Sequence, residues 1–174
     1  MAEKDKQDLL SALSEVQRGA DLIGLDLSGA QLAGLKLRQV KLVSANLAGA
    51  NLINADLTES DLREANLQDA NLSGASLFGG NLEKSNLVRA NLAGANLTAV
   101  SLKDSNLQAA ILEGADLSDA VLVGANLAEA NLRYANLEDA NLKNANLKGA
   151  DLMNANLTDT NLEGVIWSDG SIVS

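Results

Sequence analysis

Residues 45–57 read ANLAGANLINADL, and this short unit recurs through most of the chain. Leu occupies every fifth position from Leu22 to Leu162, 29 times without exception. Ala stands two residues before these leucines in 20 of the 29 repeats, and Asn or Asp stands directly before them in 22. The repeat is therefore Ala-Asn/Asp-Leu-x-x, and its Leu is called the central Leu below.

A period of five fits neither a regular helix nor a flat strand. On an α-helix a step of five residues advances by about 140°, so the leucines would wind around the whole circumference. On a strand, an odd step would place successive leucines on opposite faces. Each repeat must therefore contain its own corner, with Ala and the central Leu facing in and the other three residues facing out.

Turn chemistry supports a corner after each central Leu. The second residue after that Leu is Gly, Asn or Asp in 19 of the 29 repeats. These residue types best tolerate the positive φ that a type II turn requires at its third position. A chain that bends repeatedly in one sense coils, and stacked coils can pair as parallel ladders. The absence of Pro agrees, because a central strand cannot lose a backbone donor.

The repeat resembles that of the pentapeptide-repeat family, over residues 20–167. The resemblance implies an all-β solenoid, a right-handed quadrilateral parallel β-helix in which four repeats form one coil. The 29 repeats then make seven coils and one further repeat. At ~4.8 Å per coil, the rod is expected to be about 35 Å long. Uninterrupted chains of this kind look most like the members that are common in cyanobacteria.

Residues 1–19 are predicted to form an N-terminal capping α-helix. An uncovered solenoid end exposes apolar core and unpaired ladder groups, so an end needs a cap. Within Lys4–Arg18, the residues Leu9, Leu13 and Val16 share one helical face, and Gly19 is a natural terminator. A helix lying on a membrane surface is the alternative, which its mixed polar face disfavours.

The C-terminal end leaves the repeat and carries the only Trp of the chain. Residues 20–167 are predicted to form the β-helix and residues 168–174 a short tail. Trp167 keeps the phase of the central leucines. Two interpretations stay open: Trp167 and the tail plug the last coil, or Ile166 and Trp167 form an end-to-end contact in a homodimer. The protein is thus expected to be a monomer or a C-terminal end-to-end homodimer.

Composition argues against catalysis. The chain has no His and no Cys, so the commonest general base, the commonest transition-metal ligand and thiolate chemistry are missing. We therefore predict a protein that is not an enzyme and that has no cofactor and no metal site. The sequence also has no run of signal-peptide or transmembrane length. It is accordingly predicted to be cytoplasmic and to have no membrane partner.

Charge is unevenly distributed over the four columns that residues 20 positions apart would form. The formal net charge is −10. The columns that start at Leu22, Leu27 and Leu32 are nearly neutral, whereas the column that starts at Leu37 has bases only at Lys36 and Arg38. Beyond its first coil that column carries seven acids, which form a candidate acidic interaction face: Asp56, Glu59, Asp116, Asp119, Glu138, Asp139 and Asp159.

Several interpretations of this face remain open. The acids could serve solubility alone. They could chelate calcium, although one flat column cannot easily surround an ion. They could also imitate the phosphates of duplex DNA.

The leading functional hypothesis is a non-catalytic binding or scaffold protein that presents an elongated acidic surface to a protein partner of unknown identity. The alternative comes from the resemblance, because some pentapeptide-repeat proteins mimic DNA and inhibit gyrase. This chain would then inhibit DNA gyrase or another DNA-binding enzyme. Direct nucleic-acid binding is not expected, since a basic patch is lacking beyond Lys36, Arg38 and Lys41.

Overall fold

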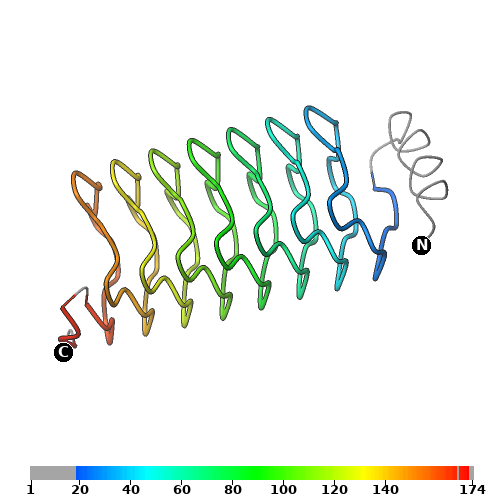
Figure 1. Cartoon of the computed structure of the whole chain (residues 1–174). Helices are drawn as coiled ribbons and strands as arrows, with labels where there is room; N and C mark the ends of the chain where they lie inside the picture. Colours follow the sequence, from blue (N-terminus) through cyan, green and yellow to red (C-terminus); the bar gives the residue numbers. More distant parts are fainter. Residues whose placement is uncertain (1–18, 168, 173–174) are drawn as a thin grey trace.

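The chain forms a solenoid of stacked coils along one axis (Figure 1). The structure is a computed structural model, and it describes residues 19–167 and 169–172. Pairing runs through single-residue parallel β-bridges that join residues 20 apart, from Asp21↔Lys41 to Asn146↔Ile166. Four five-residue repeats therefore make one coil, and the 29 repeats make seven coils and one repeat. Within the described residues there is no helix and no strand longer than one bridge residue.

The core is a stack of leucines and alanines, which confirms the predicted inward positions. Every central Leu from Leu27 to Leu147 is at most 1% exposed. The Ala two residues earlier is buried as well, as at Ala45 and Ala95. Burying one Leu side chain stabilises the folded chain by roughly 1.5–3 kcal/mol. The buried leucines therefore supply most of the driving force for coiling.

Each corner is closed by a turn whose third residue has a positive φ. The N–H of Ala50 donates to the carbonyl of Leu47 at 3.0 Å, and this bond recurs along the chain. The residue two after the central Leu has a positive φ in all 29 repeats, as at Gly49 with 64° and Asp139 with 57°. Ten of these residues are neither Gly, Asn nor Asp, yet none is Val, Ile or Thr. The left-handed region is least accessible to those β-branched side chains.

Every backbone N–H of the repeat around Leu47 has an acceptor. In the repeat of Leu47, the N–H of Leu47 donates to Asn66 of the next coil at 2.7 Å, and the N–H of Gly49 donates to Gln68 at 2.8 Å. The N–H of Asn46 donates back to Leu25 at 2.9 Å. A Pro at any of these positions would remove a bond between coils, which explains why the chain has none.

Polar residues at inward positions are hydrogen bonded. The hydroxyls of Ser60, Ser85 and Ser105 donate to the carbonyls of Leu37, Leu82 and Leu102 at 2.8, 2.7 and 2.6 Å. Among the described residues, no buried side-chain nitrogen or oxygen lacks a partner. These serines replace Ala without leaving an unsatisfied group in the core.

The predicted capping helix, residues 1–19 with Lys4–Arg18 as its body, lies outside the described residues except for Gly19. That glycine has a φ of 85°, and its N–H donates to the carbonyl of Arg38 at 3.2 Å. At the other end, the chain after Trp167 turns back, and Ile172 pairs with Ile166 in an antiparallel bridge.

Candidate interaction surfaces

The outer surface divides into four columns of repeats stacked one coil apart. Column one is centred on Leu22 and its equivalents up to Leu162, column two on Leu27 to Leu147, column three on Leu32 to Leu152, and column four on Leu37 to Leu157. In each repeat the residues before and after the central Leu face outward and are half-buried or exposed in most cases. Any interaction surface is therefore assembled from short rows of side chains, each contributed by a different coil.

The Asn and Asp residues that precede the central leucines serve the backbone. All 22 of them accept the N–H of the residue two positions later, as Asn46 Oδ1 does from Ala48 at 3.3 Å. Asn amides also bond between coils, since Asn66 Nδ2 donates to Asn46 Oδ1 at 3.1 Å and Asn86 Nδ2 to Asn66 Oδ1 at 3.0 Å. The Asn ladder of column two, from Asn46 to Asn146, is thus part of the fold.

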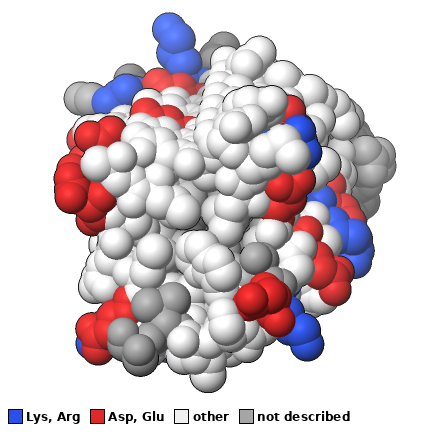
Figure 2. Space-filling view, turned by 90° about the vertical axis from the view of Figure 1, so that its left-hand side faces the viewer, with Lys and Arg blue, Asp and Glu red and all other residues white. Residues whose placement is uncertain are grey.

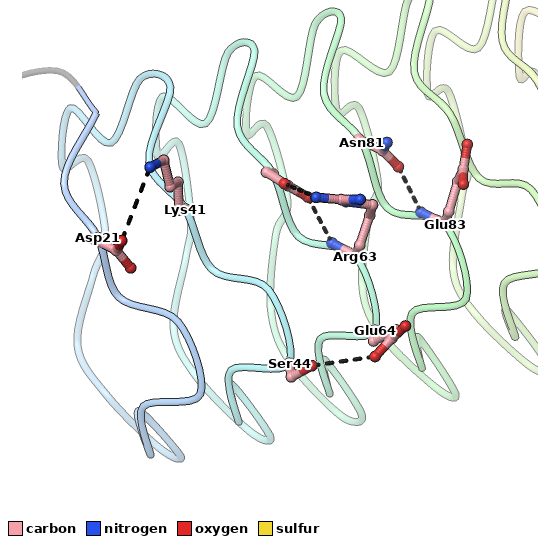
Figure 3. Close-up of polar contacts among 8 residues, drawn as sticks. Asp21, Lys41, Ser44, Arg63, Glu64, Asn81 and Glu83 are labelled. Atoms are coloured by element: carbon pink, nitrogen blue, oxygen red, sulfur yellow. Dashed lines mark hydrogen bonds and ion pairs between the residues drawn. The ribbon is translucent and has the colours of Figure 1, made fainter.

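Column one is neutralised by ion pairs and hydrogen bonds (Figure 3). Arg63 contacts Asp61 at 2.7 Å, and Lys41 lies 3.9 Å from Asp21. The hydrogen bond from the Arg63 side chain is the main reason why the pKa of Asp61 lies below its usual value. Near the C-terminal end, Lys143 contacts Glu163 at 2.9 Å.

Columns two and three each contain one ion pair between described residues. Arg89 and Asp69 of column two make two contacts of 2.7 Å, which lower the pKa of Asp69. In column three, Arg133 contacts Asp151 at 3.1 Å. The pKa of Asp151 is lowered first by the backbone N–H of Met153 and then by this arginine. Charge on these two columns is therefore largely compensated.

Column four begins with one ion-paired acid, Asp56, and one acid with a neutral partner, Glu59. Arg38 contacts Asp56 at 3.4 Å, and Gln39 Nε2 donates to Glu59 Oε2 at 2.6 Å. Burial raises the pKa of Asp56, but hydrogen bonds from Thr58 and the charge of Arg38 outweigh it and lower the pKa overall. Asp56 is thus an ion-paired member of the predicted acidic face and contributes little free charge.

Among the described residues, the acids in the C-terminal half of column four have only neutral partners or none. Asp116 accepts the N–H and hydroxyl of Ser118 at 3.1 and 2.8 Å, and Asn136 Nδ2 at 3.1 Å. Burial raises the pKa of Asp116, whereas these bonds lower it more, so the carboxylate stays ionised. Glu138 accepts Asn156 Nδ2 at 3.2 Å.

Three further aspartates occupy the turn position in three successive coils. Asp119, Asp139 and Asp159 are exposed and have φ values of 57°, 57° and 55°. None of them forms an ion pair with another residue of the described chain. We call Asp116, Asp119, Glu138, Asp139 and Asp159 the acidic cluster.

The predicted face is therefore two groups and not one continuous row. In the third and fourth coils the outward residues of column four are uncharged, and Phe78 there is 43% exposed. Asp56 and Glu59 lie on the N-terminal side of this gap, and the acidic cluster lies on its C-terminal side. Of the seven predicted residues, the structure brings only these five together.

The described residues offer no enclosed site. No pocket is found among them. No three Asp or Glu side chains converge as a metal ligand set in residues 19–167 or 169–172. In that same part of the chain, no helix has the length and apolar character needed to cross a bilayer.

The C-terminal end of the rod combines an apolar centre with a charged rim. Viewed end-on, Figure 2 shows Asp, Glu, Lys and Arg around the edge and uncharged atoms across the middle. Trp167 is half-buried against the core, its N–H donates to Ser171 at 2.6 Å, and Gly170 donates to its carbonyl at 2.9 Å. The tail therefore covers the part of this end where Ile166 lies, on column two.

The fold and the repeat place the chain in a known family. The model for pentapeptide repeats, present in 8 copies, matches overlapping segments that together span residues 41–166. The chain belongs to the pentapeptide-repeat family. Members of this family fold as right-handed quadrilateral β-helices, as the resemblance implied, and they are generally structural or binding proteins.

Solved structures of pentapeptide repeat proteins resemble this chain. A protein from the Arabidopsis thaliana thylakoid lumen is 39% identical over 62% of this chain and 71% of its own, with a TM-score of 0.53. HetL from the cyanobacterium Nostoc, involved in heterocyst differentiation regulation, is 32% identical over 99% and 100%, with a TM-score of 0.27. The plasmid-mediated fluoroquinolone resistance protein QnrB1 is 15% identical over 86% and 80%, with a TM-score of 0.35. A search of curated proteins gave no match.

Proposed function

We propose that the protein is a non-catalytic binding or scaffold protein that presents the acidic cluster of column four to a basic surface of a protein partner. The observation that carries this proposal is the stack of Asp119, Asp139 and Asp159, one coil apart and exposed. These three acids all occupy the turn position of column four, in successive coils. A partner therefore meets a straight line of negative charge on a rigid rod.

The contrast with the other columns supports a role beyond folding. Columns one, two and three each place an Arg or Lys against an acid, at 2.7 Å for Arg63 and Asp61. Among the described residues, the acidic cluster accepts hydrogen bonds only from neutral groups. Like charges on adjacent strands repel, so the stacking of these charges lowers stability slightly. A row of uncompensated acids does provide a field that attracts and orients a cationic partner.

The geometry defines the kind of partner. Asp119 and Asp159 are two coils apart, which at ~4.8 Å per coil is about 10 Å along the axis. A helix with Lys or Arg at successive turns, about 5.4 Å apart and about 11 Å over two turns, comes close to this spacing. The partner surface is therefore expected to be a short basic segment and not a deep groove.

DNA mimicry, the alternative, is less well supported by the charge density. Duplex DNA carries one charge per about 1.7 Å of its axis. The stacked aspartates provide one charge per coil, or one per ~4.8 Å, and the third and fourth coils of column four provide none. Similarity to QnrB1 at 15% identity concerns the fold alone. We expect no inhibition of gyrase supercoiling at micromolar protein, and inhibition would favour the alternative.

A quantitative pull-down from the native cell extract tests the proposal. The acidic-cluster variant combines Asp119→Asn, Glu138→Gln, Asp139→Asn and Asp159→Asn, which keeps side-chain size and lets Asn occupy the positive-φ turn positions. A control variant neutralises four acids of column one instead: Glu64→Gln, Glu83→Gln, Asp104→Asn and Glu163→Gln. Both variants change the formal charge from −10 to −6, so they remove the same amount of charge from two different columns.

We expect the wild type and the control variant to capture a partner protein that the acidic-cluster variant does not capture. Added salt should weaken this capture, because exposed charges are screened within about 8–10 Å at physiological ionic strength. Circular dichroism should show that both variants fold. If the partner is retained by the acidic-cluster variant at unchanged affinity across salt concentrations, the partner binds elsewhere.

A further inference from the structure

In column four, the residue that follows the central Leu bonds to the next coil in several repeats. The hydroxyls of Thr58 and Ser76 lie 3.0 Å apart, and Glu138 accepts the Nδ2 of Asn156 at 3.2 Å. Phe78 stands at this position in the third coil, and its ring can make no such bond. Phe78 therefore gives up a link between coils that a polar side chain at the same position can form.

The ring of Phe78 is exposed in the middle of an uncharged surface. Phe78 is the only Phe of the chain and is 43% exposed. Beside it, Gly79 and Ala99 occupy the turn position of the third and fourth coils, and the N–H of Gly79 donates to the carbonyl of Thr98 at 3.0 Å. A single exposed apolar side chain is common on protein surfaces. Phe78 differs because acids lie on both sides of the uncharged surface around it.

The acids on both sides stand in one line. We call the turn position of column four, from its second to its seventh coil, the turn row: Glu59, Gly79, Ala99, Asp119, Asp139 and Asp159. All six residues are exposed. Glu59 accepts a hydrogen bond from the neutral Gln39 at 2.6 Å and forms no ion pair with another described residue. The row therefore has negative charge at both ends and an apolar part between them, which is the usual arrangement of centre and rim in a protein interface.

We propose that the turn row and Phe78 bind one amphipathic helix of a protein partner, which lies along the rod with apolar residues over Phe78 and Ala99 and with Lys or Arg over the acids at both ends. This inference rests on the proposed function, because the acidic cluster supplies the C-terminal part of the contact. Charge complementarity selects a cationic partner. The exposed aromatic ring at the centre selects apolar residues between its bases, since buried aromatic residues at the centre of an interface carry much of the binding energy.

The spacing of the coils favours a helix over an extended segment. Coils follow one another at ~4.8 Å, and the turns of a helix at about 5.4 Å. One residue of a helix face can therefore lie over each coil, and the mismatch from Glu59 to Asp159 sums to only about 3 Å. The long, flexible side chain of Lys can absorb this difference. Alternate residues of an extended segment are ~6.7 Å apart, so their mismatch over the same distance reaches about 9 Å.

Fluorescence anisotropy with two labelled synthetic peptides tests the inference on the full chain. The first probe is an Ala-rich helical peptide of about 19 residues with one designed position per turn on one face. In order, these positions carry Lys, Leu, Leu, Lys, Lys and Lys, to match the order of the turn row. The second probe has Gln in place of both Leu. The two probes have the same charge, so their difference in affinity measures the apolar centre of the contact.

Wild type should bind the first probe about tenfold or more tightly than the second. Phe78→Thr should bind both probes alike, and it should fold because Thr58 occupies the equivalent position one coil earlier. Tyr134→Asn is the matched control. It removes another exposed aromatic ring, 55% exposed on column three, and Asn154 occupies the equivalent position one coil later. This control should keep the full preference for the first probe.

NMR of the wild-type chain gives a readout that needs no variant. The amides of Gly79 and Ala99 should shift when the first probe is added, and they should shift less with the second. The amide of Gly24, on column one, should stay in place with both. If Phe78→Thr does not fold, these wild-type shifts still decide whether the apolar part of the row is in contact with the Leu residues.

The outcomes separate this inference from the proposed function. Equal affinity of wild type for both probes, or no binding of the first probe at about 1 mM, would overturn the inference. If both probes bind equally, and the acidic-cluster variant binds neither, the proposed function stands without it. A preference for the first probe that needs Phe78 but survives in the acidic-cluster variant would support the apolar contact and contradict the proposed role of the acids.

Discussion

Asn46 Oδ1 accepts two hydrogen bonds, one from the N–H of Ala48 at 3.3 Å and one from Nδ2 of Asn66 at 3.1 Å, one coil further along. One side chain thereby closes its own turn and joins two coils. In the repeat of Leu47, the N–H of Ala48, which follows the central Leu, is the one backbone donor that bonds to a side chain and not to a backbone carbonyl. The preference for Asn or Asp at this position therefore follows from backbone hydrogen bonding, and it requires no ligand.

Replacing Asn66 with Ala tests this role. Asn66 takes part in three hydrogen bonds: it donates to Asn46 and accepts from Asn86 and from the N–H of Gln68. At roughly 0.5–1.5 kcal/mol each, partly recovered by water, their loss should cost about 1–3 kcal/mol. Urea unfolding followed by circular dichroism measures it. Gln108→Ala is the control, and an equal effect of both variants would contradict a structural role for the ladder.

The inward Ala and Leu and the turn position could be predicted from the sequence because both depend on local geometry. A period of five excludes helix and flat strand, and all 29 turn residues have the positive φ that residues such as Gly49 and Asn54 indicated. The family then supplied the coil of four repeats, which the bridges between residues 20 apart confirm. The local conformation and the stacking of the coils could thus be predicted from the sequence and the family.

Which charged residues form ion pairs could not be predicted in the same way. The columns align residues 20 apart, but several side chains reach diagonally to residues 18 apart, as Arg38 does to Asp56 and Arg133 to Asp151. Such a diagonal contact joins the residue that follows one central Leu to the residue that precedes the central Leu of the same column in the next coil. Counting charges at a separation of 18 would have found Arg38 and Asp56. The N–H groups of Leu152, Leu157 and Leu162 in the last coil have no acceptor among the described residues. This depends in addition on which way each N–H points, and no residue type records that direction.

Leu92→Ala should remove a buried side chain that is 1% exposed and leave a cavity, at a cost of about 2–5 kcal/mol. Leu152→Ala should cost less, because Leu152 lies in the last coil and is only half-buried. The unfolding midpoints of both variants measure the difference. Equal losses at the two sites would show that the end of the rod is as well covered as its middle.

The turn position should reject β-branched residues. Ala99 has a φ of 55°, a conformation that costs a non-glycine residue about 1–2 kcal/mol. Ala99→Val should lower stability by about 1–3 kcal/mol, since a β-branched side chain fits this region worst. Ala99→Gly should raise stability by up to about 1 kcal/mol, because Gly relieves the strain but gains freedom in the unfolded chain. Thermal and urea unfolding measure both effects.

The control for this pair is Ala93→Val, one position after a central Leu, where φ is not positive. Valine already occurs at the equivalent positions Val43, Val88 and Val123. This variant should change the unfolding midpoint little. If Val is tolerated at residue 99 as well as at residue 93, the positive φ is not what selects the turn residues.

The ion pair of Asp61 and Arg63 should make stability depend on pH in the acid range. The hydrogen bond from Arg63 holds the folded-state pKa of Asp61 below the unfolded value of 3.8. The unfolded chain therefore binds this proton more readily, so the contribution of the pair is fully present above pH 3.8 and is lost as the pH falls through the folded pKa. Asp61→Asn keeps the acceptor oxygen for the N–H of Arg63 and removes the charge. The difference in urea midpoint between wild type and this variant should be constant at neutral pH and should shrink toward zero at the lowest pH. A difference that persists after Asp61 is protonated would assign the effect to the shape of the turn and not to the charge.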